Sequence, residues 1–132
     1  MFRFGRFTLA AFGLLVSLVS CATPPKQAPE GAASTAAVEK VAWEAIEKGA
    51  VIVDVRTDEE FQLGHLPGAL HIPYDQMGAR AGEIPGGQKQ AMVLYCRSGR
   101  RSGIAKQTLE GLGYTNTING GGFEALERAK PQ

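Results

Sequence analysis

The chain has 132 residues, a length that fits one domain, and 44% of its residues are hydrophobic, as in ordinary globular proteins. Fourteen Lys and Arg residues against 13 Asp and Glu give a formal net charge of +1, so the overall charge gives no reason to expect nucleic-acid binding. The basic residues that do cluster follow Cys96, and they indicate a local site for an anion.

The first 20 residues have the pattern of a signal peptide. Arg3 and Arg6 supply positive charge, residues 8–19 form an apolar stretch, and the small residue Ser20 follows. This stretch is too short for a comfortable membrane span, which needs about 20 residues. We therefore expect residues 1–20 to be a signal peptide and the mature protein to be exported.

The end of this segment, Leu18-Val19-Ser20-Cys21, resembles the lipobox of bacterial lipoproteins. That resemblance implies that Cys21 is lipidated, becomes the first mature residue and anchors the protein to a membrane. Because Ala22 rather than Asp follows, it further implies a periplasm-facing protein of the outer membrane. An ordinary secretory signal, or an uncleaved anchor with an incidental Cys21, stays open as the alternative.

Residues 22–37 are rich in Ala and Pro and contain no large apolar side chain. This composition predicts that residues 21–37 form the lipid-bearing cysteine and a disordered tether. Residues 38–130 then form the folded domain. If Cys21 carries lipid, Cys96 is the only thiol left, and an unpaired cysteine in an exported protein is a candidate reactive group.

Helix and strand patterns alternate along this domain, which predicts an α/β fold with a parallel sheet. The strands are expected at residues 51–55, 69–72, 91–95 and 114–118, and the helices at 38–48, 58–64, 74–82, 102–112 and 123–129. Thr57 and Glu60 form a predicted capping box. The apolar faces are predicted to hold Val38, Val41, Ala42, Ala45 and Ile46 in the first helix, and Ile104, Ala105, Leu109 and Leu112 in the fourth. We expect a turn at residues 120–122.

Cys96 follows the apolar stretch 91–95 and precedes a predicted helix. The positive end of a helix dipole and free backbone N–H groups favour an anion at such a place. Three arginines within the next five residues add positive charge. Together they predict a thiol pKa below the usual value of about 8.5, and hence a nucleophilic thiolate.

Several motifs in order resemble a single-domain rhodanese, a thiosulfate sulfurtransferase-like protein, over residues 38–129. They are Asp54-Val55-Arg56, residues 64–69, Ile72-Pro73, the Cys96 loop and Asn119-Gly120-Gly121. The resemblance implies a rhodanese-like fold, a small parallel sheet with helices on both faces, and Cys96 at the C-terminal end of a strand. It also implies that Cys96 takes sulfur from a donor such as thiosulfate, forms a persulfide, and passes the sulfur to a thiol or to cyanide.

The loop after Cys96 supplies the candidate substrate-binding residues: Arg97, Ser98, Gly99, Arg100, Arg101 and Ser102. Their backbone amides predict an anion-binding nest, and the guanidinium groups of Arg100 and Arg101 are candidates to hold an anionic donor. Alternatively, Arg97 points to solvent, and Ser102 only caps the helix. We expect Arg56 to pair with Glu59 or Glu60, with pocket lining as its second possible role.

Other functions are weighed against sulfur transfer. Cys-based phosphatases and arsenate reductases have a cysteine followed by five residues and then an arginine. Here the sixth residue after Cys96 is Ser102. A thiol-disulfide oxidoreductase would need a resolving cysteine near Cys96, and this sequence has none there. A non-catalytic module that binds or carries sulfur is a further alternative. His65 and His71 belong to no metal-ligand motif, so we expect neither a metal nor another cofactor.

Overall fold

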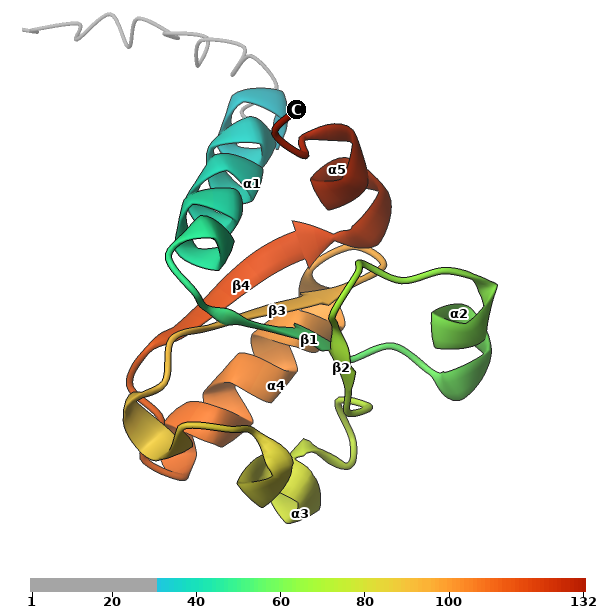
Figure 1. Ribbon diagram of the computed structural model, residues 1–132. Helices are drawn as coiled ribbons and strands as arrows, with labels where there is room; N and C mark the ends of the chain where they lie inside the picture. Colours follow the sequence, from blue (N-terminus) through green and yellow to red (C-terminus); the bar gives the residue numbers. More distant parts are fainter. Residues whose placement is uncertain (1–30) are drawn as a thin grey trace, which may run out of the picture.

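A computed structural model describes residues 31–132, with side chains from Thr35 onward. Its centre is a four-stranded parallel sheet with the strand order β2-β1-β3-β4 (Figure 1). The strands are β1 (Val51–Asp54), β2 (Leu70–His71), β3 (Met92–Cys96) and β4 (Thr117–Gly122). The predicted α/β class with a small parallel sheet is confirmed.

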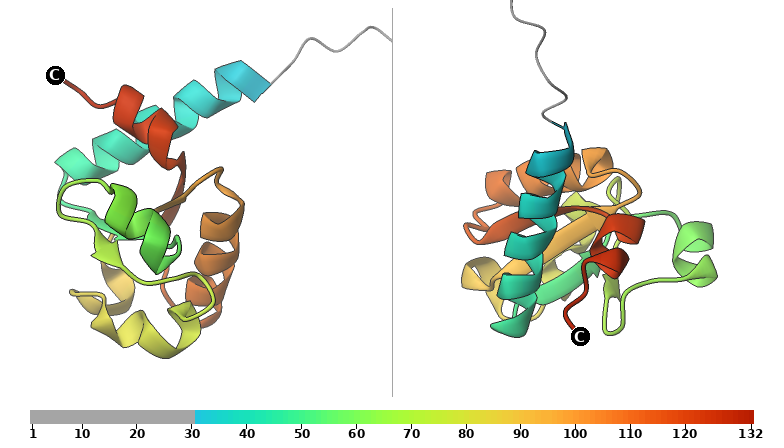
Figure 2. Two further views of the ribbon diagram at one scale, coloured as in Figure 1. Left: turned by 90° about the vertical axis from the view of Figure 1, so that its right-hand side faces the viewer. Right: turned by 90° about the horizontal axis from the view of Figure 1, so that it is seen from above.

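Helices cover both faces of this sheet. The helices α1 (Gly31–Glu47) and α5 (Phe123–Arg128) lie on one face, and α3 (Met77–Arg80) and α4 (Arg100–Gly111) on the other (Figures 1 and 2). Two short 3₁₀ turns, Ala81–Glu83 and Gly87–Lys89, join α3 to β3. The helix α2 (Asp58–Leu63) lies beyond the carboxyl ends of the strands, and no helix among the described residues is long and apolar enough to cross a bilayer.

The central strand β3 divides the hydrophobic core into two layers, because successive side chains point to opposite faces. Met92, Leu94 and Cys96 join the layer beneath α3 and α4, together with Ala105 and Leu109. The other layer, beneath α1 and α5, contains Val93, Tyr95, Ala42, Trp43 and Leu126. Cys96 is therefore held by the most buried strand of the molecule, with its side chain on the α4 face.

The first helix differs from its prediction in length and in orientation. It begins at Gly31, so the predicted tether is helical from that residue onward. Val38 and Val41 are exposed, while Glu39, Ala42 and Trp43 face the core. Trp43 packs there and donates a hydrogen bond of 2.8 Å from Nε1 to the carbonyl of Leu126.

Two further predictions of local structure are wrong. Ala105 and Leu109 of α4 are buried, but Ile104 of the same helix and Leu112, which directly follows the helix, are exposed. Residues 120–122 form the end of β4, where the pairing with β3 shifts register, instead of a turn. The capping box of Thr57 and Glu60 is confirmed, and α2 ends before Gly64 as expected.

Candidate active site

Cys96 ends β3, and the chain then turns sharply into α4. Gly99 precedes the first turn of α4 with a positive φ of 91°. A methyl group built on Gly99 would lie 3.3 Å from Cα of Gly121, so this position needs glycine for both conformation and space. The turn brings the beginning of α4 back over the Cys96 sulfur, which is buried in the structure.

Hydrogen-bond donors of the loop surround this sulfur. The backbone N–H of Gly99 donates to Sγ at 3.0 Å, and the hydroxyl of Ser102 lies 3.6 Å from Sγ. Burial raises the pKa of the Cys96 thiol, but backbone N–H groups of Ser102, Ser98 and Gly99, helped by the Ser102 hydroxyl, outweigh it and leave the pKa below its ordinary value. The site can therefore hold an anionic sulfur while excluding water from it.

Asn119 of β4 fixes the shape of the loop from behind. Its Nδ2 donates to the carbonyl of Gly99 at 2.9 Å, and its Oδ1 accepts from the N–H of Gly121 at 3.0 Å. The same Oδ1 lies 2.7 Å from the Ser102 hydroxyl, which is also 3.0 Å from the Gly99 carbonyl. Since a hydroxyl carries one proton, Ser102 donates to one of these acceptors at a time and can turn to Sγ when the sulfur is charged.

Arg101 ties the loop to α2. Its two terminal nitrogens donate to the carboxylate of Glu60 at 2.6 and 2.8 Å, a bidentate pair that is largely shielded from solvent. The hydrogen bond from Arg101 lowers the pKa of Glu60 to about 2. Arg101 also interacts electrostatically with Cys96, so its positive charge favours an anionic sulfur there. Its two terminal nitrogens are already bonded to Glu60.

Arg56 does not pair with Glu59 or Glu60, contrary to the prediction. It donates from Nε and a terminal nitrogen to the buried carboxylate of Asp54, at 3.0 and 2.6 Å. Its guanidinium carbon also lies 4.4 Å from the ring centre of Phe123. Asp54 also accepts a hydrogen bond of 3.0 Å from the Arg56 backbone N–H, so its carboxylate supports the local backbone as well as the guanidinium.

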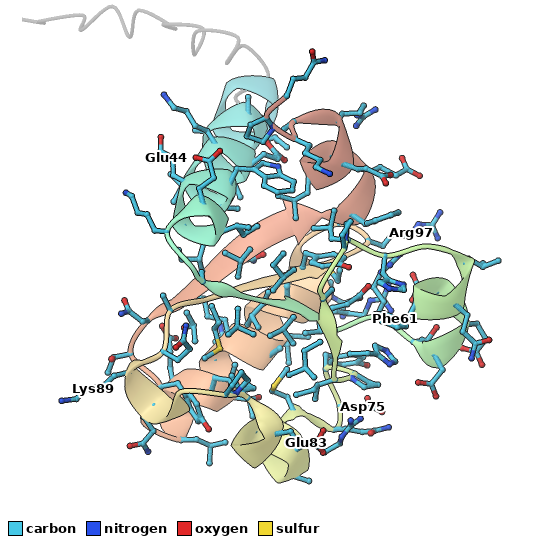
Figure 3. The ribbon with its side chains drawn as sticks, in the orientation of Figure 1. Glu44, Phe61, Asp75, Glu83, Lys89 and Arg97 are labelled. Carbon is cyan, nitrogen blue, oxygen red and sulfur yellow. The ribbon has the colours of Figure 1, made fainter. Side chains whose placement is uncertain are left out.

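A cavity of about 310 Å³ opens beside the loop, between α2 and the start of α5. Its walls combine cationic, acidic and apolar side chains: Arg56, Arg97, Glu60, Glu124, Leu63 and Phe123. Arg97 is exposed, lies toward α2 and forms no ion pair with any described residue (Figure 3). Among the described residues that line this cavity, Arg97 is thus the cation without an ion-pair partner.

The remaining loop residues are more peripheral. Ser98 is exposed, although its backbone N–H contributes to the low pKa of Cys96. Arg100 is exposed at the first residue of α4. Ser102 lies inside the first turn of α4, where it is buried and bonded to Asn119, so its role is not that of a helix cap.

Both histidines face backbone carbonyls. His65 contacts the carbonyl of Phe61 at 2.9 Å, and His71 that of Arg56 at 3.0 Å. Within residues 31–132, no group of three His, Cys, Asp or Glu side chains is placed to hold a metal ion.

Sequence reasoning missed two residues of the site. Asn119 was recognised only as part of a C-terminal motif, although a polar side chain before two glycines at the end of a strand is a signal for a loop contact. Glu60 was assigned to the capping box, which it does form, but its bond to Arg101 spans 41 positions and no local pattern indicates it.

Geometrically, the site is a buried cysteine sulfur with a lowered pKa, at the carboxyl end of a parallel strand and next to donating backbone amides. The chain matches the rhodanese-like domain over residues 39–129 and belongs to that family. Thiosulfate sulfurtransferase PspE of Escherichia coli is 35% identical over 78 residues, which cover 59% of this chain and 75% of PspE.

A further relative and two solved structures are also similar to part of this chain. A putative sulfur carrier protein of Bacillus subtilis, YrkF, is 38% identical over 52% of this chain but only 36% of its own length. A solved structure of an E. coli rhodanese with anions aligns with a TM-score of 0.56 and 34% identity, covering 58% of this chain and 91% of that one. The human single-domain sulfurtransferase TSTD1 aligns with a TM-score of 0.57 at 25% identity, over 67% and 90% of the two chains.

Proposed function

We propose that this protein is a sulfurtransferase that moves a sulfane sulfur from thiosulfate or a related donor to a thiol or cyanide through a Cys96 persulfide. The observation that carries the proposal is the Cys96 sulfur, which accepts the Gly99 N–H at 3.0 Å and has a lowered pKa. Membership in a family that includes a thiosulfate sulfurtransferase supports it.

In the first half-reaction, the Cys96 thiolate attacks the outer sulfur of thiosulfate. The new S–S bond forms on Cys96, the bond to the sulfonate sulfur breaks, and its electron pair leaves with sulfite. In the second, the acceptor anion attacks the outer sulfur of the persulfide and restores the thiolate. No separate base is needed once the thiol is ionised.

The loop suits each species along this path because all of them are anions. The amides that lower the pKa of Cys96 are also placed to stabilise the negative charge of a persulfide. Arg97 at the cavity offers a cation to the oxyanions of the donor, whereas Arg101 supports the loop through Glu60.

The test is thiocyanate formation from thiosulfate and cyanide by the full chain, purified in a non-ionic detergent. We expect turnover by the wild type and none by Cys96→Ala. Mass spectrometry after thiosulfate alone should find one added sulfur, located on Cys96. Thiocyanate formation that survives the Cys96→Ala substitution would exclude the proposed mechanism.

A sulfur carrier is the second candidate, because YrkF is a putative carrier. A carrier would form the same persulfide but would not turn over with cyanide or small thiols. Phosphatase activity is a less favoured alternative, since Ser102 occupies the position at which Cys-based phosphatases have an arginine. Measured hydrolysis of phosphate esters in the same preparation would revive it.

We also propose that the protein is exported and anchored by lipid at Cys21, facing the periplasm, with the outer membrane as its site. Residues 1–30, including the predicted signal peptide and Cys21, lie outside the described residues. The support is the sequence pattern of residues 1–22 alone.

A further inference from the structure

A second pocket, of about 330 Å³, lies on the other side of the Cys96 loop, between α1 and the end of β4. It shares no lining residue with the cavity at Arg97. The polar side chains that line it are those of Glu39, Asn119, Ser98 and Thr35, and no Lys, Arg or His is among the described residues that line it. The pocket therefore offers one carboxylate and several neutral polar groups.

Glu39 is the unusual feature of this pocket. It is only 3% exposed, and its Oε1 has no hydrogen-bond partner among the described residues. A buried carboxylate oxygen without a donor is costly, since removing it from water is not offset by a hydrogen bond. A ligand that brings both a positive charge and N–H donors would remove this cost.

The carboxylate is directed toward the glycines of β4. A methyl group built on Gly121 would lie 3.7 Å from Glu39 Oε1, so this oxygen faces the bare backbone of Gly121. Gly121 in turn packs against Gly99, whose N–H donates to the Cys96 sulfur. Contacts through Gly121 and Gly99 thus connect Glu39 with the Cys96 sulfur, on the side of the loop opposite the first cavity.

Asn119, a second polar group of the pocket, is already oriented. Asn119 uses its amide nitrogen for the Gly99 carbonyl and its oxygen for Ser102 and Gly121. Because these bonds hold the pocket wall in place, a ligand would meet a formed surface. A metal ion is disfavoured, since a single carboxylate contributes and no group of three metal-ligating side chains exists within residues 31–132.

We propose that this pocket is a second ligand site that binds the ammonium group of a small alkylamine, with Glu39 as the counter-charge. Its volume equals that of about ten water molecules, which admits a ligand of several non-hydrogen atoms. An anion is repelled by the carboxylate, and a neutral alcohol supplies a single donor without charge. The site is independent of sulfur transfer and extends the protein's binding functions beyond it.

The experiment uses the full chain in non-ionic detergent at constant ionic strength. n-Butylammonium chloride is titrated by calorimetry and by amide NMR spectra, with n-butanol as the uncharged match. We expect saturable one-site binding of butylammonium that shifts the Gly99 and Gly121 amides, and no saturation by butanol. Glu39→Gln should weaken binding at least about 10-fold, as expected for losing a hydrogen bond to a charged group.

Glu44→Gln is the matched control, since Glu44 is exposed on the same helix (Figure 3) and its loss should leave the affinity unchanged. Cys96→Ala should also keep the affinity, which separates this site from the sulfur reaction. The proposal is overturned if butylammonium does not saturate the wild type, if butanol binds equally well, or if Glu39→Gln binds as the wild type does. If Glu39→Gln fails to fold, the wild-type amide shifts decide: absence of shifts at Gly99 and Gly121 contradicts the site.

Discussion

At the scale of single residues, the chemistry depends on how many donors face one sulfur. Burial alone would raise the pKa of the Cys96 thiol, and the amides of Ser98, Gly99 and Ser102 outweigh that effect and lower it. Most of these donors belong to the backbone and cannot be removed by substitution. The Ser102 hydroxyl is the exception, and it offers a test of the charge balance.

Ser102→Ala should raise the pKa of Cys96 because the thiolate loses a donor. Thiolate reactivity would then appear at higher pH, and at neutral pH the sulfur-transfer rate should fall about 10-fold, as expected for one hydrogen bond to a charged group. The measurement is the rate of Cys96 alkylation by iodoacetamide against pH, with Cys21 blocked by lipid or replaced by Ser.

Ser98→Ala is the control for that series, since only the backbone N–H of Ser98 acts on Cys96. Its alkylation profile should overlay that of the wild type. A Ser102→Ala midpoint equal to or lower than the wild-type midpoint would show that the hydroxyl does not stabilise the thiolate.

At the scale of elements, the site depends on α2 being held against the loop. The helix α2 buries none of its own residues, so its position relies on contacts such as Glu60 with Arg101. The folded-state pKa of Glu60, about 2, lies below its ordinary value of 4.5. The pair therefore stabilises the fold above pH 4.5, and this contribution is lost as the pH falls from 4.5 to about 2.

Glu60→Gln removes the charge but keeps a side chain that can form the capping box. We expect it to lower the free energy of unfolding at pH 7 by on the order of 1 kcal/mol, a figure discounted for the partial exposure of the pair. The difference from the wild type should vanish near pH 2. Urea unfolding at several pH values measures it. The exposed pair of Glu83 and Arg80 is the control, because Glu83→Gln should leave the stability close to that of the wild type.

The helices also show what sequence can and cannot establish. Periodicity identified both α1 and α4, but it placed Val41 and Leu112 on buried faces that the structure exposes. An apolar stripe is wider than the contact that a helix makes with a sheet, and neighbouring elements decide which edge is covered. The Cys96 turn, by contrast, was predictable because a strand, a glycine and a helix start are all local features.

Substitutions of Leu109 and Leu112 can test which apolar side chains of the α4 region are buried. Leu109 is fully buried on the face of α4 that packs on the core, whereas Leu112 is 43% exposed. Leu109→Ala should cost about 2–5 kcal/mol of unfolding free energy by leaving a cavity, and Leu112→Ala less than about 1 kcal/mol. Equal losses for the two variants in urea unfolding would contradict the packing described for α4.

At the scale of the whole molecule, residues far apart in sequence meet at one end of the sheet. Cys96 from β3, Asn119 from β4 and Glu60 from α2 converge there because parallel strands end at the same edge. Sequence motifs indicated the family, yet two other features arise only when α1, α2 and β4 are packed together. They are the bond from Glu60 to Arg101 and the Glu39 Oε1 atom, which has no hydrogen-bond partner within the part of the chain that the structure describes.

The same scale includes the proposed anchor. Because α1 already begins at Gly31, only residues 22–30 separate Cys21 from the first helix. Even at full extension, about 3.6 Å per residue, a segment of this length reaches no more than roughly 32 Å, so a lipid on Cys21 would keep the domain close to the membrane. Cys21→Ser should move the protein from the membrane fraction to the soluble periplasmic fraction and abolish incorporation of a labelled fatty acid.

Cys96→Ser, which alters the other cysteine, should leave both membrane association and the lipid label intact. Fractionation of inner and outer membranes then locates the wild type, which we expect in the outer membrane because Ala22 rather than Asp follows Cys21. Membrane association that persists in Cys21→Ser without any lipid label would instead point to an uncleaved anchor formed by residues 8–19. In that outcome the N-terminal residues would remain on the mature chain, and intact-mass measurement would find them there.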